Sequence, residues 1–417
     1  MKLKDFILRD KNGDLVDVNW DFVETVPQLT ALKKCQQSTK WHSEGNAFIH
    51  TQHVVKHMIE RIKTDPSFTI GPYHADILVG AALFHDLGKA TTTEFKKGDW
   101  HSYGHEVESE KILREMLWDE CFDTREVLCA LVAMHMEPLF YNENNWFKKM
   151  YDANKRLNSF GPYTVADLIL LKWADTMGST PDVEGKNDKD LAYLNNLFNA
   201  VGENKQEMEK LHDVTGYNNL RLVEFLKTYN KINSIVKDFN GKENRNNKKS
   251  VTAIVLIGLP GAGKNWWYEH EFPKMFPNES HVMVSRDDIR IQLGFCKEGE
   301  KFLGNDSQEA EVTRIFNNSI KTGAATNNVV VINNTNLRRK YRDQYKELLE
   351  KLYNVTWIYV YTEAEDLMTN ILRRNGQIPS NQFSSMARKF EWPVPDEYDE
   401  LIIVHSGANV ELPDPQK

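Results

Sequence analysis

Apolar residues recur at helical spacing through the first half of the chain, from about Trp41 to Leu226. Their repeat of three or four positions predicts amphipathic helices, and the short polar breaks between them predict a helical domain. The clearest helical segments are Thr51–Ile62, Ala75–Leu83, His105–Met116, Thr124–His135 and Val165–Thr176.

The pattern changes near residue 250. Short β-branched runs at Ala253–Ile257, Val329–Ile332 and Val355–Tyr361 alternate with helical segments, which is typical of an α/β domain with a largely parallel sheet. Between the halves, Lys237–Ser250 is rich in Asn and Lys and has the composition of a linker. We therefore predict a helical domain over residues 1–236, including an extension over residues 1–40, a linker over residues 237–250 and an α/β domain over residues 251–417.

Composition narrows the class of protein. The chain has 417 residues, and 52 Lys and Arg against 60 Asp and Glu give a formal net charge of −8, which excludes a bulk polycation. No apolar stretch approaches the roughly 18 residues of a membrane span, and the N-terminus lacks an apolar signal segment, so we expect no membrane association. Four cysteines without Cys-x-x-Cys spacing indicate reduced thiols in a cytoplasmic protein.

A phosphate-binding loop follows the first predicted strand. Residues 258–264 fit G-x-x-x-x-G-K between a strand and a helix, where backbone N–H groups and the helix N-terminus favour phosphate. Asn265 stands where a Ser or Thr hydroxyl usually meets Mg²⁺, and its amide oxygen could replace that hydroxyl. The predicted nucleotide-binding residues in this loop are Gly258, Gly261, Ala262, Gly263, Lys264 and Asn265.

The segment Ser285–Arg290 is the best candidate for the acceptor side of a phosphoryl transfer. Asp287 can accept a proton from an attacking hydroxyl, and Arg290, one helical turn on, can hold a phosphate. Taken alone, the same residues also suit an acidic helix start with an i,i+3 salt bridge.

These motifs, with Asn334-Thr335-Asn336-Leu337 and Arg373-Arg374-Asn375, resemble the 5′-OH polynucleotide kinase family over about 150 residues. The resemblance implies that Asp287 is the general base on the 5′-hydroxyl and that Arg290 grips the adjoining phosphate. It also implies that Lys264 stabilises the transferring phosphoryl group and that Arg374 belongs to a helical lid over the donor NTP.

The sequence departs from that family's pattern in three places. Asn265 replaces the hydroxyl of the phosphate-binding loop, Asn334 stands where an Asp is common, and the lid segment after Arg374 is short and lacks a second arginine. The first two departures concern the placement of Mg²⁺, and the third concerns lid chemistry.

Histidines are concentrated in the helical half, where nine of the thirteen lie within the first 135 residues. Several of them, with two aspartates, fall on predicted helices. Such a cluster is costly to bury without a cation, so it predicts a metal site, the alternative being a coincidence of core and surface histidines. The predicted metal ligands are His50, His85, Asp86, His105, His135 and Asp175.

The segments around these residues resemble the HD superfamily of metal-dependent phosphohydrolases. They are similar to the HD domain of many bacterial CCA-adding enzymes, which is a 2′-phosphatase and 2′,3′-cyclic phosphodiesterase. The resemblance implies that His50, His85, Asp86 and Asp175 bind metal, and that the other two histidines hold a second metal or the phosphate. It also implies that Lys89, in His85-Asp86-Leu87-Gly88-Lys89, meets a phosphate oxygen.

Together the two halves resemble bacterial enzymes that fuse an HD phosphohydrolase to a polynucleotide 5′-kinase. The resemblance implies healing of RNA or DNA ends that carry a 5′-OH and a 2′-phosphate or 2′,3′-cyclic phosphate. It implies ATP or another NTP with Mg²⁺ in the kinase, Mn²⁺, Ni²⁺ or Co²⁺ in the HD site, and a separate ligase as partner. Two alternatives are a nucleoside or nucleotide kinase joined to an HD nucleotidase, and an NTP-sensing module that regulates the HD domain.

Overall fold

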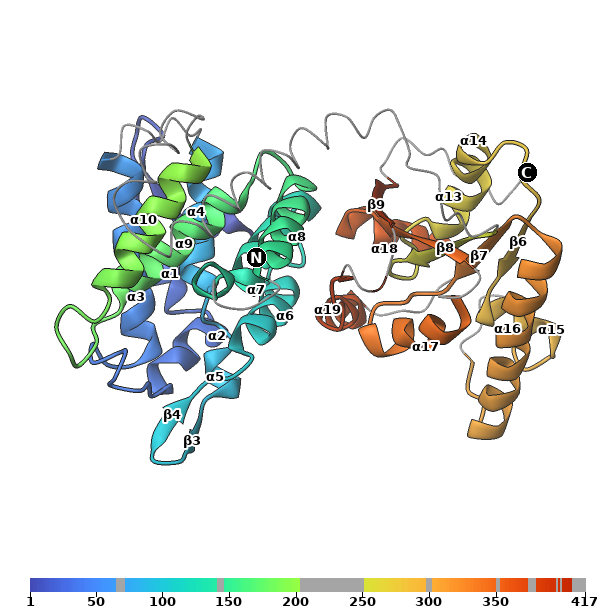
Figure 1. Ribbon diagram of the computed structural model, residues 1–417, viewed down its shortest axis with the longest axis horizontal. Coiled ribbons are helices and arrows are strands. Elements are labelled where there is room, and N and C mark those ends of the chain that lie inside the picture. The colour runs from blue at the N-terminus through green and yellow to red at the C-terminus, as the bar shows by residue number, and fades with distance from the viewer. Residues whose placement is uncertain are drawn as a thin grey trace. The chain divides into compact units, whose positions relative to one another are not determined.

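The computed structural model describes residues 1–64, 72–140, 146–202, 251–297, 302–349, 353–373, 380–394, 397 and 400–406. The chain forms two compact units, residues 1–243 and residues 244–417 (Figure 1). The predicted linker lies outside the described residues, so its bounds stay a prediction.

The first unit is helical, as the apolar spacing predicts. Helices α3 (Ala47–Thr64), α4 (Pro72–Phe84), α7 (Phe122–Met134) and α9 (Val165–Gly178) pack on one another and carry the buried core. Helix α4 is buried along its last turns because its residues are apolar on every side, which suits a central position. The remaining longer helices are α6 (His105–Met116), α8 (Trp146–Asn158) and α10 (Asp188–Gly202), and the short ones are α5 (Lys89–Thr92) and η3 (Glu137–Leu139).

The N-terminal extension packs on the helical unit. Its strand β2 contacts α3 and α4, and the ring of Phe6 meets Phe84 of α4 edge-on at 5.1 Å between centroids. The extension therefore adds to the core. Its elements are η1 (Leu3–Phe6), β1 (Ile7–Arg9), β2 (Leu15–Val18), α1 (Trp20–Val23), α2 (Pro27–Thr30) and η2 (Ala31–Lys34).

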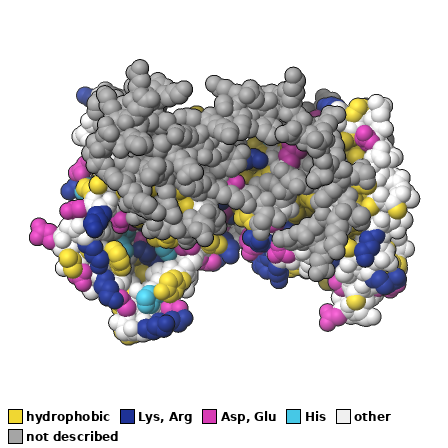
Figure 2. All heavy atoms as spheres, in the orientation of Figure 1, with side chains coloured by type: hydrophobic (Ala, Val, Ile, Leu, Met, Phe, Trp, Pro, Cys, Tyr) yellow, Lys and Arg dark blue, Asp and Glu magenta, His cyan; other side chains and the backbone are white. Residues whose placement is uncertain are grey.

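An antiparallel hairpin, which the sequence pattern did not reveal, separates α5 from α6. Its strands are β3 (Glu94–Lys96) and β4 (Asp99–His101), joined by a two-residue turn. The side chains of Phe95, Trp100 and Tyr103 are exposed here, with Phe95 and Trp100 in edge-to-face contact. At the tip of this hairpin, hydrophobic, histidine and lysine or arginine side chains lie beside one another (Figure 2).

The second unit contains a parallel sheet of five strands in the order β6-β7-β5-β8-β9, which confirms the predicted α/β domain. The three predicted strand runs become β5, β7 and β8, while β6 and β9 were not among the predicted runs. The strands are β5 (Val251–Ile257), β6 (His281–Val284), β7 (Val329–Asn333), β8 (Tyr353–Tyr361) and β9 (Glu400–His405). The helices are α13 (Lys264–His270), α14 (Phe272–Met275), α15 (Arg286–Gln292), α16 (Asp306–Thr326), α17 (Arg339–Leu349), α18 (Ala364–Arg373) and α19 (Ser380–Arg388).

Because all five strands are parallel, their carboxyl ends lie along one edge of the sheet. The residues that follow β5, β6 and β7 therefore share that edge, where ligands bind in open α/β sheets. Within the described residues, no helix is long and apolar enough to cross a membrane.

Candidate metal centre and phosphate-binding loop

Three buried histidines of the helical unit are held with the same ring nitrogen pointing inward. His85 follows α4, His105 begins α6 and His135 follows α7. In each, Nδ1 donates a hydrogen bond of 2.8–2.9 Å to the backbone carbonyl three residues earlier. A carbonyl can only accept, so the other nitrogen, Nε2, carries the lone pair, and this is the arrangement that prepares an imidazole for a metal.

Two aspartates face these nitrogens. Asp86 Oδ2 lies 3.2 Å from His85 Nε2, and Asp86 Oδ1 lies 3.3 Å from His105 Nε2. Asp175 Oδ1, near the end of α9, lies 3.7 Å from His85 Nε2 and 2.9 Å from His50 Nε2. His105 and His135 approach each other at 3.3 Å between their Nε2 atoms.

The six predicted metal ligands therefore lie in one cluster, which we call the HD cluster. His50, His85 and Asp175 have donor atoms within 4.8 Å of one another, and so do Asp86, His105 and His135. His85 Nε2 and Asp86 Oδ1 are buried without a hydrogen-bond partner within the described residues. Unsatisfied nitrogen and carboxylate donors that converge in a buried site fit a divalent cation.

The turn that presents Asp86 depends on Gly88. A Cβ at this position would lie 2.1 Å from the carbonyl oxygen of His105, so only glycine allows the turn to approach α6 so closely. The backbone N–H of Gly88 donates to Ser109 Oγ at 2.7 Å, which fixes the turn on the same helix. The glycine of the H-D-L-G-K segment is thus a packing requirement of the site.

Two lysines form ion pairs with the aspartates of the HD cluster. Lys89 Nζ lies 2.7 Å from Asp86 Oδ2, and Lys172 Nζ lies 2.6 Å from Asp175 Oδ2. Burial opposes the charge of Asp86, but its interactions with His85 and with the Lys89 ammonium outweigh it and lower its pKa well below the usual value. Burial likewise opposes the charge of Lys89, yet Asp86 raises its pKa. The buried Lys89 ammonium therefore lies beside the predicted metal ligands, where it could contact an oxygen of a bound phosphate.

His50 differs from the other histidines because both of its nitrogens face carboxylates. Nδ1 lies 3.0 Å from Glu44 Oε1, and Nε2 faces Asp175. Burial disfavours protonation, but the hydrogen bonds to Asp175 and Glu44 outweigh it and raise the pKa of His50 to about 9. Glu44 also lies 2.8 Å from His42 Nδ1, and burial lowers the pKa of His42 to about 4. A cation at His50 would have to displace a proton.

Three residues of the site escaped sequence reasoning. Glu44 lies within the segment that carries the HD resemblance, and Lys172 lies one turn before Asp175 on α9, so both had a signal in the sequence. Gln37 had none. It belongs to the extension, and its Oε1 accepts a hydrogen bond of 2.8 Å from Lys89.

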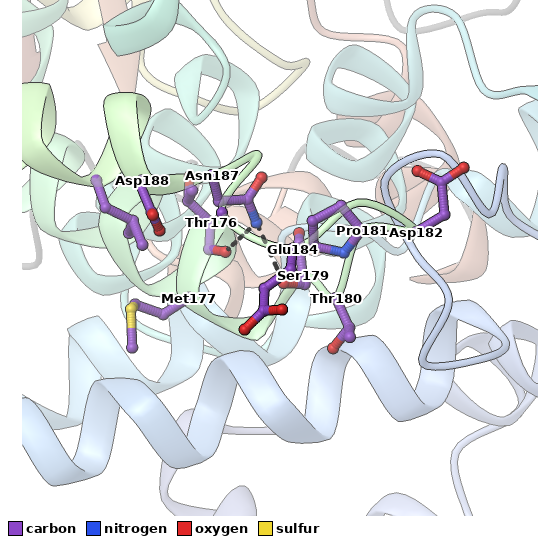
Figure 3. A pocket seen from close by; sticks show the side chains of 11 residues that line it. Thr176, Met177, Ser179, Thr180, Pro181, Asp182, Glu184, Asn187 and Asp188 are labelled. Carbon is purple, nitrogen blue, oxygen red and sulfur yellow. Dashed lines mark hydrogen bonds between the residues drawn. The ribbon is translucent and has the colours of Figure 1, made fainter.

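An open cavity of about 420 Å³ lies where α9 ends and α10 begins. Thr176, Ser179, Thr180 and Asn187 line part of it, and Asn187 donates to the carbonyls of Thr176 and Ser179 (Figure 3). None of the six predicted ligands lines this cavity, although the residue after Asp175 does. The hydrogen bonds of Asn187 brace the end of the helix that carries Asp175.

In the second unit, the phosphate-binding loop joins β5 to α13. Gly258 has φ +156°, and a Cβ there would lie 2.4 Å from the carbonyl oxygen of Val360. Lys264 Nζ donates hydrogen bonds of 2.9 Å to the carbonyls of Gly258 and Leu259, so the lysine side chain folds back onto the loop that precedes it. The loop residues thus have the placement that the motif predicts, while nucleotide binding by them stays a prediction.

Amide side chains connect this loop to its neighbours. Asn333, the last residue of β7, donates a hydrogen bond of 2.7 Å from Nδ2 to Asn265 Oδ1. Asn334 instead donates to the hydroxyl of Tyr345 and accepts from the backbone of Arg286. The residue of β7 that touches the loop is therefore Asn333, which sequence reasoning did not single out.

The acceptor candidates lie on α15, which follows β6. Arg290 Nη1 contacts Asp287 Oδ1 at 2.7 Å, so the i,i+3 pair forms. Glu309 on α16 accepts from Arg290 at 2.9 and 3.1 Å and from Arg286 at 2.9 Å. The side chain of Asp287 is 84% exposed. Arg374 lies outside the described residues.

Comparisons with known proteins identify a domain in each unit. Residues 48–176 match the family described as HD domain, and residues 254–393 match the family described as AAA domain. A comparison with curated proteins found no match. The N-terminal part is therefore a helical HD domain, the C-terminal part has a P-loop kinase fold, and the pair supports an enzyme with phosphohydrolase and kinase activities. HD domains bind divalent metals, and P-loop kinases use an NTP with Mg²⁺.

Solved structures resemble parts of the chain at low identity. A chain of a Pnkp1/Rnl/Hen1 complex is 20% identical over 30% of this chain and 40% of that chain, with a TM-score of 0.26. A chain of a Pnkp1/Rnl/Hen1 RNA repair complex is 18% identical over 36% and 46%, with a TM-score of 0.30. A gluconokinase from Sinorhizobium meliloti 1021 is 16% identical over 38% and 84%, with a TM-score of 0.26. The chain thus spans less than half the length of the first two.

Proposed function

We propose that this chain, an HD domain joined to a P-loop kinase domain, heals broken RNA ends. The kinase domain phosphorylates a 5′-OH with an NTP, and the HD domain removes a 2′-phosphate or a 2′,3′-cyclic phosphate. The observation that supports the proposal is that one chain carries both a metal-type cluster with a buried lysine and a phosphate loop with an Asp–Arg pair at the same sheet edge. The healed ends are substrates for a separate ligase, and DNA ends are a second possible substrate.

In the HD domain, His50, His85, Asp86 and Asp175 would hold one divalent cation. His105 and His135 would hold a second cation or the phosphate. Mixed imidazole and carboxylate donors suit Mn²⁺, Ni²⁺ or Co²⁺. When bound, such a cation lowers the pKa of a bound water and polarises the phosphate.

Lys89 then donates from Nζ to a non-bridging phosphate oxygen. Its buried position keeps water away from that contact and strengthens it. Asp86 holds the ammonium in place at 2.7 Å until the substrate arrives.

In the kinase domain, Lys264 leaves its two loop carbonyls to neutralise charge on the transferring phosphoryl group. Asp287 accepts the proton of the 5′-hydroxyl as that oxygen bonds to the γ-phosphorus and the nucleoside diphosphate leaves. Arg290 binds the adjoining phosphate of the strand, and Arg374 contacts the NTP phosphates. The exposure of Asp287 supports a polymer end as acceptor, because a base for a small nucleoside works best in an enclosed pocket.

The test uses an oligoribonucleotide with a 5′-OH and a 2′,3′-cyclic phosphate, a second one with a 2′-phosphate, ATP, and Mg²⁺ or Mn²⁺. Both ends are read on one gel. We expect the full chain to add a 5′-phosphate and to remove the 3′-end phosphate. Lys264→Ala abolishes only the first reaction, and Asp86→Ala abolishes only the second.

His53→Ala is the matched control, because His53 shares a helix with His50 but is not part of the HD cluster. Its two activities should equal those of the wild type. If nucleosides outcompete the 5′-OH strand, the acceptor is a small molecule and the polynucleotide proposal is wrong. If ATP binds but labels no acceptor, the P-loop domain is a sensor.

A further inference from the structure

The place beside the phosphate-binding loop where P-loop enzymes hold Mg²⁺ is occupied here by two amides. The usual protein ligands are the hydroxyl that follows the loop lysine and an aspartate on a neighbouring strand. In this chain Asn265 follows Lys264, and Asn333 ends β7, the strand paired with β5. Their side chains meet at 2.7 Å. Neither position offers a negative charge, so these residues do not fit the usual cation site.

The contact makes the two amides depend on each other, although only Asn265 is one of the departures noted in the sequence. A serine at position 265 would be too short to keep this bond without a shift of β7, and an aspartate at position 333 could not donate to the Asn265 oxygen. Asn333 is also 8% exposed, and its amide lies close to Met283, so an unpaired amide there would lose hydrogen bonds that water cannot restore. The two amides therefore form one unit, which we call the amide clasp.

We infer that the amide clasp makes nucleotide binding by this domain nearly independent of Mg²⁺. A carboxylate at the end of β7 would repel the nucleotide phosphates unless a cation lay between them. A neutral amide removes that repulsion, and a clasp that opens can donate an N–H to a phosphate oxygen. The inference rests on the kinase half of the proposed function, since it concerns the same nucleotide, and it names the residues that set the metal dependence.

The experiment measures the dissociation constant of ATP for the full chain by calorimetry, once with Mg²⁺ and once with EDTA. For the wild type we expect the two values to agree within about threefold, because no protein carboxylate at the loop needs screening. For Asn265→Ser with Asn333→Asp, EDTA should weaken binding about tenfold or more, since the introduced carboxylate then faces the phosphates without a cation.

Asn334→Asp is the matched control. It adds the same charge one residue later, but Asn334 faces Tyr345 and not Asn265, so its Mg²⁺ dependence should stay close to that of the wild type. Lys264→Ala should lose binding in both buffers, which locates the nucleotide at the loop. If the double variant does not fold by circular dichroism, Asn333→Asp alone carries the same expectation.

A wild-type affinity that falls tenfold or more in EDTA overturns the inference, and so does a double variant that behaves like the wild type. Absence of ATP binding in both buffers overturns the inference together with the kinase proposal. If the dissociation constant of ATP is the same with Mg²⁺ and with EDTA but no 5′-OH strand is phosphorylated, the inference about the amide clasp is supported and only the proposed kinase activity is contradicted.

Discussion

Lys89 donates a hydrogen bond of 2.8 Å to Gln37, a residue of the N-terminal extension that lies 52 positions earlier. Both side chains are buried, and the second polar atom of Gln37, Nε2, has no hydrogen-bond partner within the described residues. The family match begins at residue 48, so the extension contributes to the HD cluster from outside the matched domain.

Replacing Gln37 should therefore impair the HD domain. Gln37→Leu removes the acceptor that orients the Lys89 ammonium, so we expect kcat/KM for 2′-phosphate removal to fall by roughly tenfold to a hundredfold. The 5′-kinase rate should not change. Gln36→Leu is the control, because its neighbour Gln36 is exposed. An unchanged phosphatase rate in Gln37→Leu would show that Lys89 needs no support from the extension.

Metal binding by the HD cluster should depend steeply on pH. His50 has a pKa near 9, so below that pH its Nε2 carries a proton that a cation must displace. The apparent affinity for Mn²⁺ should thus rise up to about tenfold per pH unit between pH 7 and pH 9 and then level off. Competition with a chelator at three pH values measures this. In His50→Ala the slope should be shallower, and a slope that is the same in both proteins would contradict the assignment.

The sequence predicted that the residues of the HD cluster lie together, because several of them fall on the buried faces of predicted helices, while their role as metal ligands stays a prediction. His50 and Asp175 face inward on helices whose apolar stripe points to the core, and that stripe is visible in the pattern of residues. The role of Gln37 depends on how a distant segment packs, which no local pattern records. The sequence also does not show which of Asn333 and Asn334 faces the phosphate-binding loop. That depends on the residue at which strand β7 ends, and the structure places Asn333 against Asn265 and Asn334 against Tyr345.

Glu309 should control binding of the acceptor strand. It fixes the guanidinium of Arg290 with three hydrogen bonds, so Glu309→Gln leaves the arginine less well oriented. We expect the KM for the 5′-OH strand to rise by about tenfold while the KM for ATP is unchanged. Glu311→Gln, two residues later on α16 and exposed, serves as control. If the KM values for the strand and for ATP rise equally, the substitution has disturbed the fold of the kinase domain, and the specific role of Glu309 in acceptor binding is contradicted.

A buried ion network should dominate the stability of the HD domain. Glu126 on α7 accepts hydrogen bonds from Arg114 at 2.9 and 3.1 Å and from Arg125 at 3.1 Å, and all three side chains are buried. Glu126→Gln removes the carboxylate that Arg114 and Arg125 share, while Glu110 still pairs with Arg114 at 2.6 Å, so we expect the free energy of unfolding to fall by about 3 kcal/mol. Urea titration measures it. The exposed pair Lys33–Glu24 provides the control, and Glu24→Gln should cost less than about 1 kcal/mol.

The same network predicts how stability responds to acid. Burial alone would raise the pKa of Glu126, but Arg114 and Arg125 outweigh it and lower the pKa to about 2, against 4.5 for an ordinary glutamate. A lowered pKa in the folded state stabilises the fold above pH 4.5, and that contribution disappears as the pH falls toward 2. Urea titrations from pH 6 to pH 3 should therefore show a steeper loss for the wild type than for Glu126→Gln. Parallel curves would mean that other carboxylates, and not Glu126, set the acid sensitivity of this domain.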